Sequence, residues 1–115
     1  RRGCSWRPSA NLKKMEERQN WRIALHFGRQ EYEECRTVIE EALEESHGLC
    51  EYALQVKGML LRLEGKHLES LWEFQAATRL NPLSPSNVKQ VAYGLLTLEE
   101  YAASADLFEK TIRLI

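Results

Sequence analysis

Apolar side chains recur at steps of three and four residues along most of this chain, the spacing that gathers them on one face of an α-helix. The clearest example is the series Tyr32, Cys35, Val38, Ile39, Ala42 and Leu43. The same spacing, interrupted at short turns, predicts six helices. They are expected at about residues 17–27, 31–45, 49–63, 67–80, 85–97 and 101–114. The pattern therefore predicts an all-α fold.

Residues that begin and end helices lie at the predicted turns. Gly48 can take the left-handed conformation that caps a helix end. Asn81-Pro82 ends the fourth helix, since proline disfavours a helical residue before it. Ser84-Pro85 is a cap residue followed by proline at the first helical position. Glu99-Glu100 stands where a glycine turn is expected, so we expect a looser turn there.

The second and third helix pairs share one side-chain pattern, displaced by 34 residues. The aligned residues are Gly58 with Ala92, Leu61 with Leu95, His67 with Tyr101, Ser70 with Ser104, Phe74 with Phe108 and Leu80 with Leu114. Small residues allow two helices to approach closely, and phenylalanine supplies bulk between repeats. A 34-residue pair of helices is the length of a tetratricopeptide repeat, and such repeats stack to leave a curved surface for a partner. The pattern predicts a right-handed superhelical tetratricopeptide solenoid of about three helix-turn-helix repeats.

The first repeat is the weakest copy of the pattern. Cys35 and Ile39 fit its second helix, but its first helix looks slipped by about one residue. We divide the chain into a basic arm expected to be disordered, residues 1–15, and a repeat domain, residues 16–115. The repeats are placed at about 16–48, 49–84 and 85–115. We interpret Trp21 and Trp72 as core or inter-repeat packing.

Composition and charge limit which partners and cellular compartments we expect for the protein. The 115 residues carry a net charge of −1, so the molecule as a whole has no electrostatic attraction to nucleic acid or an acidic membrane. Trp6 in the basic arm allows a contact with RNA or a microtubule, but a solvated linker is the simpler interpretation. No apolar run approaches the about 20 residues of a membrane span. The cysteines Cys4, Cys35 and Cys50 form no disulfide framework, which favours a reducing compartment such as the cytoplasm.

The sequence predicts no catalytic, cofactor-binding or metal-binding site. His47 and Cys50 make only one close pair, whereas a zinc site needs four ligands in paired spacings. We therefore interpret Cys35 and Cys50 as small core residues. The six glycines are scattered and form no phosphate-binding loop. The protein is expected not to be an enzyme.

The candidate site is the concave groove, which first-helix positions face by similarity to tetratricopeptide domains. These positions are Tyr52, Gln55, Met59, Arg62, Lys89, Gln90, Tyr93 and Leu96. Tyrosine, methionine and arginine are favoured in protein interfaces. The alternative is that Met59, Tyr93 and Leu96 only pack against the next repeat. Arg62, Gln55 and Lys89 are expected to be the more exposed.

Several segments resemble one family beyond the generic repeat. They are Gln19-Asn20-Trp21, Gly48-Leu49-Cys50-Glu51-Tyr52-Ala53, Arg62-Leu63-Glu64-Gly65, Glu69-Ser70-Leu71 and Lys89-Gln90-Val91-Ala92. Cys50, Glu51 and Gln90 are not demanded by the repeat, which makes the match informative. Over about residues 18–115 the chain resembles the N-terminal repeats of the Bardet–Biedl syndrome protein 4 family of BBSome subunits.

The resemblance implies a non-enzymatic scaffold in a hetero-oligomer, acting in ciliary membrane-protein trafficking and cilium assembly. Its implied partners are other BBSome subunits, with centriolar-satellite and dynein–dynactin proteins in addition. The implied locations are the cytoplasm, the cilium, the ciliary base and the centrosome or centriolar satellites. The alternative is a generic tetratricopeptide adaptor, such as a chaperone-tail binder. That function needs a clamp of several Lys, Arg and Asn residues, of which only Lys89 and Arg62 are candidates.

The repeat register makes a prediction about stability. Phe74→Ala is expected to cost about 3–5 kcal/mol of unfolding free energy, because it empties a buried aromatic position. Glu69→Ala, on the opposite helix face, is expected to leave stability nearly unchanged. Urea denaturation of both variants would measure the difference, and the reverse ranking would refute the register.

Overall fold

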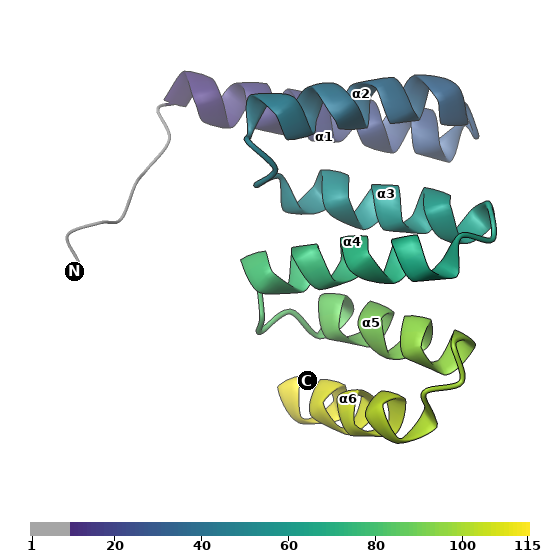
Figure 1. The fold of residues 1–115 in the computed structure, drawn as a ribbon. Coiled ribbons are helices and arrows are strands. Elements are labelled where there is room, and N and C mark those ends of the chain that lie inside the picture. The colour runs from purple at the N-terminus through teal and green to yellow at the C-terminus, as the bar shows by residue number, and fades with distance from the viewer. Residues whose placement is uncertain (1–9) are drawn as a thin grey trace.

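The computed structural model describes residues 10–115, which form six α-helices. Their bounds are α1 (Ala10–Gly28), α2 (Tyr32–Glu45), α3 (Glu51–Leu63), α4 (His67–Leu80), α5 (Pro85–Thr97) and α6 (Tyr101–Leu114). Figure 1 shows the helices stacked in chain order, with α1 and α2 at one end and α6 at the other. Within residues 10–115 there is no strand. The predicted all-α, tetratricopeptide-like helical repeat is confirmed.

The predicted helix bounds are close to the observed ones except at α1. This helix begins at Ala10, so residues 10–15, which we had assigned to the arm, are helical. Leucine, lysine and methionine in this stretch are good helix formers, and neither proline nor glycine interrupts them. The remainder of the predicted arm, residues 1–9, lies outside the described residues.

One hydrogen bond recurs in all three helix pairs and joins the two helices of each pair. Ser70 Oγ donates to the Gly58 carbonyl oxygen at 2.7 Å, and Ser104 Oγ donates to the Ala92 carbonyl oxygen at 2.8 Å. In the first pair the Cys35 thiol donates to the carbonyl oxygen of Ile23 at 3.7 Å. Each donor lies 12 residues after its acceptor. The small residues that the sequence aligned are therefore the contact points of the pairs.

The close approach in the second pair requires glycine at position 58. A Cβ atom placed on Gly58 would lie 2.8 Å from the ring of Phe74, closer than real Cβ contacts allow. Phe74 is 1% exposed, so its ring has little room to move away. The aromatic ring thus packs directly on helix backbone.

Two clusters of buried apolar side chains hold the stack together. The first joins α1, α2 and α3 and contains Ile23, Cys35, Val38, Ile39, Ala42, Cys50, Ala53, Val56 and Leu60. The second contains Leu71, Phe74 and Val91, with Leu95 and Leu107 packed against it. Met59 packs against both clusters and so links the first helix pairs to the last.

Both helices of the first pair are shifted by one residue in the sequence relative to the 34-residue repeat. Ile23 and Cys35 each lie 35 residues before their counterparts Gly58 and Ser70, whereas the next displacement is 34. The extra residue lies in the connection between α2 and α3, residues 46–50, against residues 81–84 between α4 and α5. The expectation that only the first helix is slipped was therefore wrong.

The turns inside the three pairs share one backbone conformation. Gln30, Gly65 and Glu99 occupy equivalent positions and have positive φ values of 60°, 81° and 66°. The residue after each donates its N–H to a carbonyl oxygen five residues back at 2.9 Å, as Glu100 does to Leu95. The turn at Glu99 is as tight as the glycine turn, which corrects our expectation of a looser one.

Two tryptophans that we had placed in the packing are exposed instead. Trp72 is 54% exposed, and its counterparts Thr37 and Asp106 are exposed as well, so this position faces outward in every pair. Trp21 is 70% exposed, although its counterpart Val56 is buried. Val56 is covered by α2, whereas no described element covers α1 at this point.

The left-handed turns make a prediction about stability. Glu99→Gly is expected to raise the unfolding free energy by about 0.5–1 kcal/mol, because a left-handed conformation costs a residue with a Cβ atom about 1–2 kcal/mol and glycine's larger unfolded-state entropy offsets part of that gain. Gly65→Ala at the equivalent turn should lower it by a similar amount. Thermal unfolding of both variants tests the pair, and destabilisation by Glu99→Gly would contradict the shared geometry.

Candidate functional site

The eight predicted groove residues divide into an exposed group and a half-buried group. Lys89, Tyr93 and Leu96, all on α5, are exposed. The half-buried residues are Tyr52, Gln55, Met59 and Arg62 on α3 and Gln90 on α5. Lys89 matches the expected exposure, but Arg62 and Gln55 do not. The reason is that side chains of α3 and α5 bond to each other directly.

Arg62 is held between α3, α4 and α5. Its Nη1 donates to Gln90 Oε1 at 2.7 Å, and its Nη2 donates to the Gln90 carbonyl oxygen at 3.4 Å. The guanidinium carbon lies 4.8 Å from the centre of the Phe74 ring, a cation–π contact. Burial lowers the pKa of Arg62, although arginine stays cationic at neutral pH. Arg62 is therefore a fixed positive charge among the predicted groove residues.

Gln55 belongs to a second set of polar contacts, centred on Asn87. Gln55 Nε2 donates to Asn87 Oδ1 at 2.6 Å and to Glu51 Oε2 at 3.1 Å. Asn87 Nδ2 donates to Glu51 Oε2 at 2.8 Å and lies 3.3 Å from the Ala77 carbonyl oxygen. Asn87 is 0% exposed, so its amide depends on these partners. The contacts join α3, α4 and α5 to one another.

The apolar groove residues have different surroundings. Tyr93 makes an edge-to-face contact with Phe108, with ring centres 5.1 Å apart, and stays 45% exposed. Met59 packs into the core, as the alternative interpretation had it. Tyr52 packs against the first cluster, and burial raises the pKa of its phenol. Leu96 is 44% exposed, so it offers free apolar surface as Tyr93 does.

Asn87 was missed by the sequence analysis, although the repeat contained a signal for it. Asn87 lies 34 residues after Ala53, which is fully buried. A polar residue at a buried position of the pattern indicates a polar network inside the stack. Glu51 was noted only as a residue that the repeat does not demand, and its role as the acceptor for Asn87 is new.

The described cysteines are poorly suited to nucleophilic chemistry or metal binding. Cys35 and Cys50 are buried, which confirms their interpretation as core residues. Burial raises the pKa of both thiols and so disfavours the thiolate, the reactive and metal-binding form. In the part of the chain that the structure describes, no three His, Cys, Asp or Glu side chains gather as metal ligands would. None of the described helices is long and apolar enough to cross a membrane.

The network around Asn87 makes a prediction about stability. Asn87→Ala is expected to lower the unfolding free energy by about 1–3 kcal/mol, because it removes the partner of the Gln55 amide and of the Glu51 carboxylate in a buried setting. Asn81→Ala is the matched control, since Asn81 is exposed and its amide lies 3.4 Å or more from Glu51. Its effect should stay within about 0.5 kcal/mol. Equal effects in urea denaturation would remove Asn87 from its central role.

Comparison with known proteins identifies relatives of the chain. No family model matches the sequence. The protein named BBSome complex member BBS4 from Xenopus tropicalis is 47% identical over 98 residues, which cover 85% of this chain and 19% of the relative. The proteins of the same name from Mus musculus and Bos taurus are 44% and 43% identical over the same lengths.

The chain thus spans about a fifth of the length of the curated relatives that it matches. Identity at this level over most of the chain confirms the resemblance found in the sequence. Over its matched residues the chain is a homologue of BBSome complex member BBS4, with which it shares one segment.

Proposed function

We propose that the chain is a non-enzymatic scaffold of the BBSome, acting in ciliary membrane-protein trafficking and cilium assembly. The observation that carries the proposal is the 47% identity to a protein named as a BBSome complex member. Its partners are then other BBSome subunits in a hetero-oligomer, with centriolar-satellite and dynein–dynactin proteins in addition. Its locations are the cytoplasm, the cilium, the ciliary base and the centrosome or centriolar satellites.

The groove of α3 and α5 is the surface that we assign to a partner. Arg62 and Tyr93 are held in place by Gln90 and Phe108, so little side-chain freedom is lost on binding. Leu96 offers apolar surface, and Lys89 offers a positive charge. These features suit a partner segment with an apolar side chain beside an acidic one.

The side chains of the groove also favour binding over catalysis. The eight residues include two cations but no carboxylate, histidine or cysteine. Carboxylates, histidine and cysteine are among the commonest groups in acid–base and nucleophilic catalysis, in which lysine and tyrosine also act. A scaffold role needs only shape, apolar area and charge, which this surface has.

The proposal predicts a selective loss of partners. The tagged chain is expressed in ciliated cells, purified by its tag and analysed by mass spectrometry. The unaltered chain is expected to recover other BBSome subunits, and Leu96→Ala combined with Lys89→Glu is expected to reduce that recovery several-fold. Leu68→Ala is the control, since Leu68 is similarly exposed but lies on α4.

The outcomes separate the proposal from its alternative. Recovery of chaperones or of another complex, without any BBSome subunit, would favour a generic tetratricopeptide adaptor and refute the proposed function. Undiminished recovery by the groove variant would keep BBSome membership and refute the groove as its binding surface. Circular dichroism of each variant shows whether the fold is retained.

A further inference from the structure

One face of α1 combines exposed apolar side chains with positive charge. It is formed by Lys14, Glu17, Arg18, Trp21, Arg22 and Leu25, and is called the α1 outer face below. Trp21 and Leu25 are 70% and 46% exposed. Three of its four charged residues are cations. An exposed tryptophan beside arginines is typical of a binding surface, since both residue types are enriched at binding hot spots.

The equivalent face of α3, in the next helix pair, shows what can pack on such a surface. Arg18, Trp21 and Leu25 lie 35 residues before Ala53, Val56 and Leu60 of α3, the displacement between the first two pairs. Those three α3 residues are buried in one cluster with residues of α2. The face of α3 that matches the α1 outer face is therefore covered by the preceding helix pair, by α2 together with Ile23 of α1.

The covering helix α2 is strongly acidic. Its glutamates are Glu33, Glu34, Glu40, Glu41, Glu44 and Glu45, against Arg36 alone. It is also amphipathic, with Cys35, Val38, Ile39 and Ala42 on its buried face.

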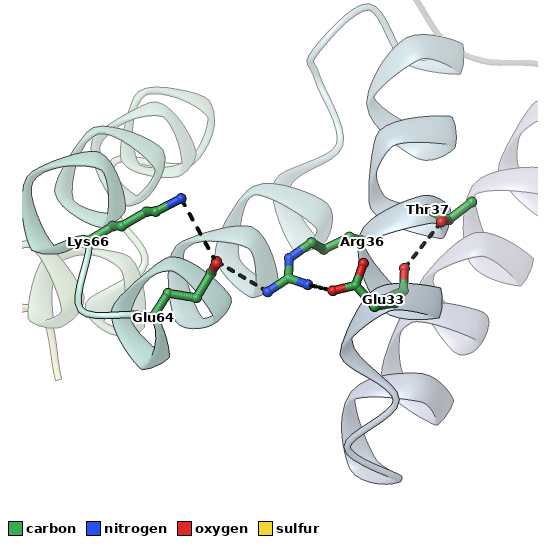
Figure 2. Close-up of polar contacts among 5 residues, drawn as sticks. All are labelled: Glu33, Arg36, Thr37, Glu64 and Lys66. Atoms are coloured by element: carbon green, nitrogen blue, oxygen red, sulfur yellow. Dashed lines mark hydrogen bonds and ion pairs between the residues drawn. The ribbon is translucent and has the colours of Figure 1, made fainter.

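Ion pairs at the surface join α2 to α3. Lys57 Nζ of α3 lies 3.4 Å from Glu40 Oε1 of α2. Figure 2 shows Arg36 of α2 reaching Glu64 after α3, where Nη2 and Oε1 are 3.2 Å apart. Arg22 lies 35 residues before Lys57 and is therefore its counterpart on α1. The α1 outer face thus has a cation at the position where Lys57 of α3 pairs with Glu40 of α2.

The guanidinium of Arg22 remains partly free of contacts within its own helix pair. It contacts Gln19 Oε1 at 2.8 Å and Glu41 Oε2 at 3.4 Å, and its side chain remains 43% exposed. The contact with Glu41 is a surface ion pair and so holds Arg22 only weakly. A second carboxylate can therefore approach it from outside.

We propose that the α1 outer face binds an acidic amphipathic helix of a partner protein, placed on α1 as α2 is placed on α3. Trp21 and Leu25 bind the apolar side of this helix, and Arg18 and Arg22 pair with its carboxylates. The site is separate from the groove of α3 and α5, so it stands or falls independently of the proposed function.

The chain itself supplies the probe for the test, a peptide of residues 31–46 with Cys35→Ser and a fluorescent label. This peptide has the charge and pattern of the proposed partner helix. Fluorescence anisotropy of the peptide is measured as the 115-residue chain is added. Binding is expected, and it should weaken as salt is raised because the contacts include ion pairs.

Two tryptophan variants locate the binding. Trp21→Ala is expected to weaken peptide binding at least about tenfold, as for a central aromatic anchor. Trp72→Ala is the matched control, because Trp72 is also exposed but lies on α4, and it should leave binding unchanged. Circular dichroism confirms that both variants are folded. Absence of binding, or undiminished binding to Trp21→Ala, overturns the proposal.

A charge exchange tests the orientation of the helix. Arg22→Glu is expected to reduce binding several-fold, and the peptide with Glu40→Lys should restore it, because the two positions correspond to Lys57 and Glu40. Restoration by a charge change at Glu34 instead would contradict this placement. Analytical ultracentrifugation supplies the last check. Self-association that Trp21→Ala abolishes, without peptide binding, would assign the face to a second copy of the chain and overturn the proposal.

Discussion

The stack depends on how closely the two helices of a pair can approach, and one hydrogen bond in each pair marks that close approach. A side chain as small as serine or cysteine donates to a backbone carbonyl oxygen of the neighbouring helix, 12 residues earlier. The carbonyl has a second lone pair, so it accepts this bond without giving up its place in its own helix. With the helices this close, Phe74 can rest on the bare backbone at Gly58 and reach Arg62 with the same ring. The buried core and Arg62, one of the predicted groove residues, therefore both contact the side chain of Phe74.

The sequence was sufficient for those parts of the fold that local chemistry decides. Helix ends followed from Pro82, Pro85 and the glycine turns, and the pairing of helices followed from the repeated small residues. Features that depend on whether another helix packs against a residue could not be predicted from the sequence. Trp21 keeps the apolar spacing of its helix, but nothing in that spacing says whether another helix covers it. The turn at Glu99 was misjudged because the bonds of the neighbouring helices can hold a residue with a Cβ atom in a left-handed conformation.

The sequence predicted which residues line the groove, but it did not predict the hydrogen bonds between them. Sequence spacing places Gln55, Arg62 and Gln90 on one face, and it cannot show that they bond across two helices rather than to solvent. Those bonds hold the three side chains half-buried, whereas Lys89, Tyr93 and Leu96 stay exposed. Asn87 is fully buried and donates to Glu51, so the placement of these side chains depends on a residue that has no exposed surface.

The extra residue between α2 and α3 bears on how such a stack can change. It lengthens the connection between two helix pairs and leaves the hydrogen bond within each pair intact. Each pair thus behaves as an indivisible block, while the links between blocks tolerate insertions and deletions, as surface connections do. A link can then change in length with no change to the residues that make each block.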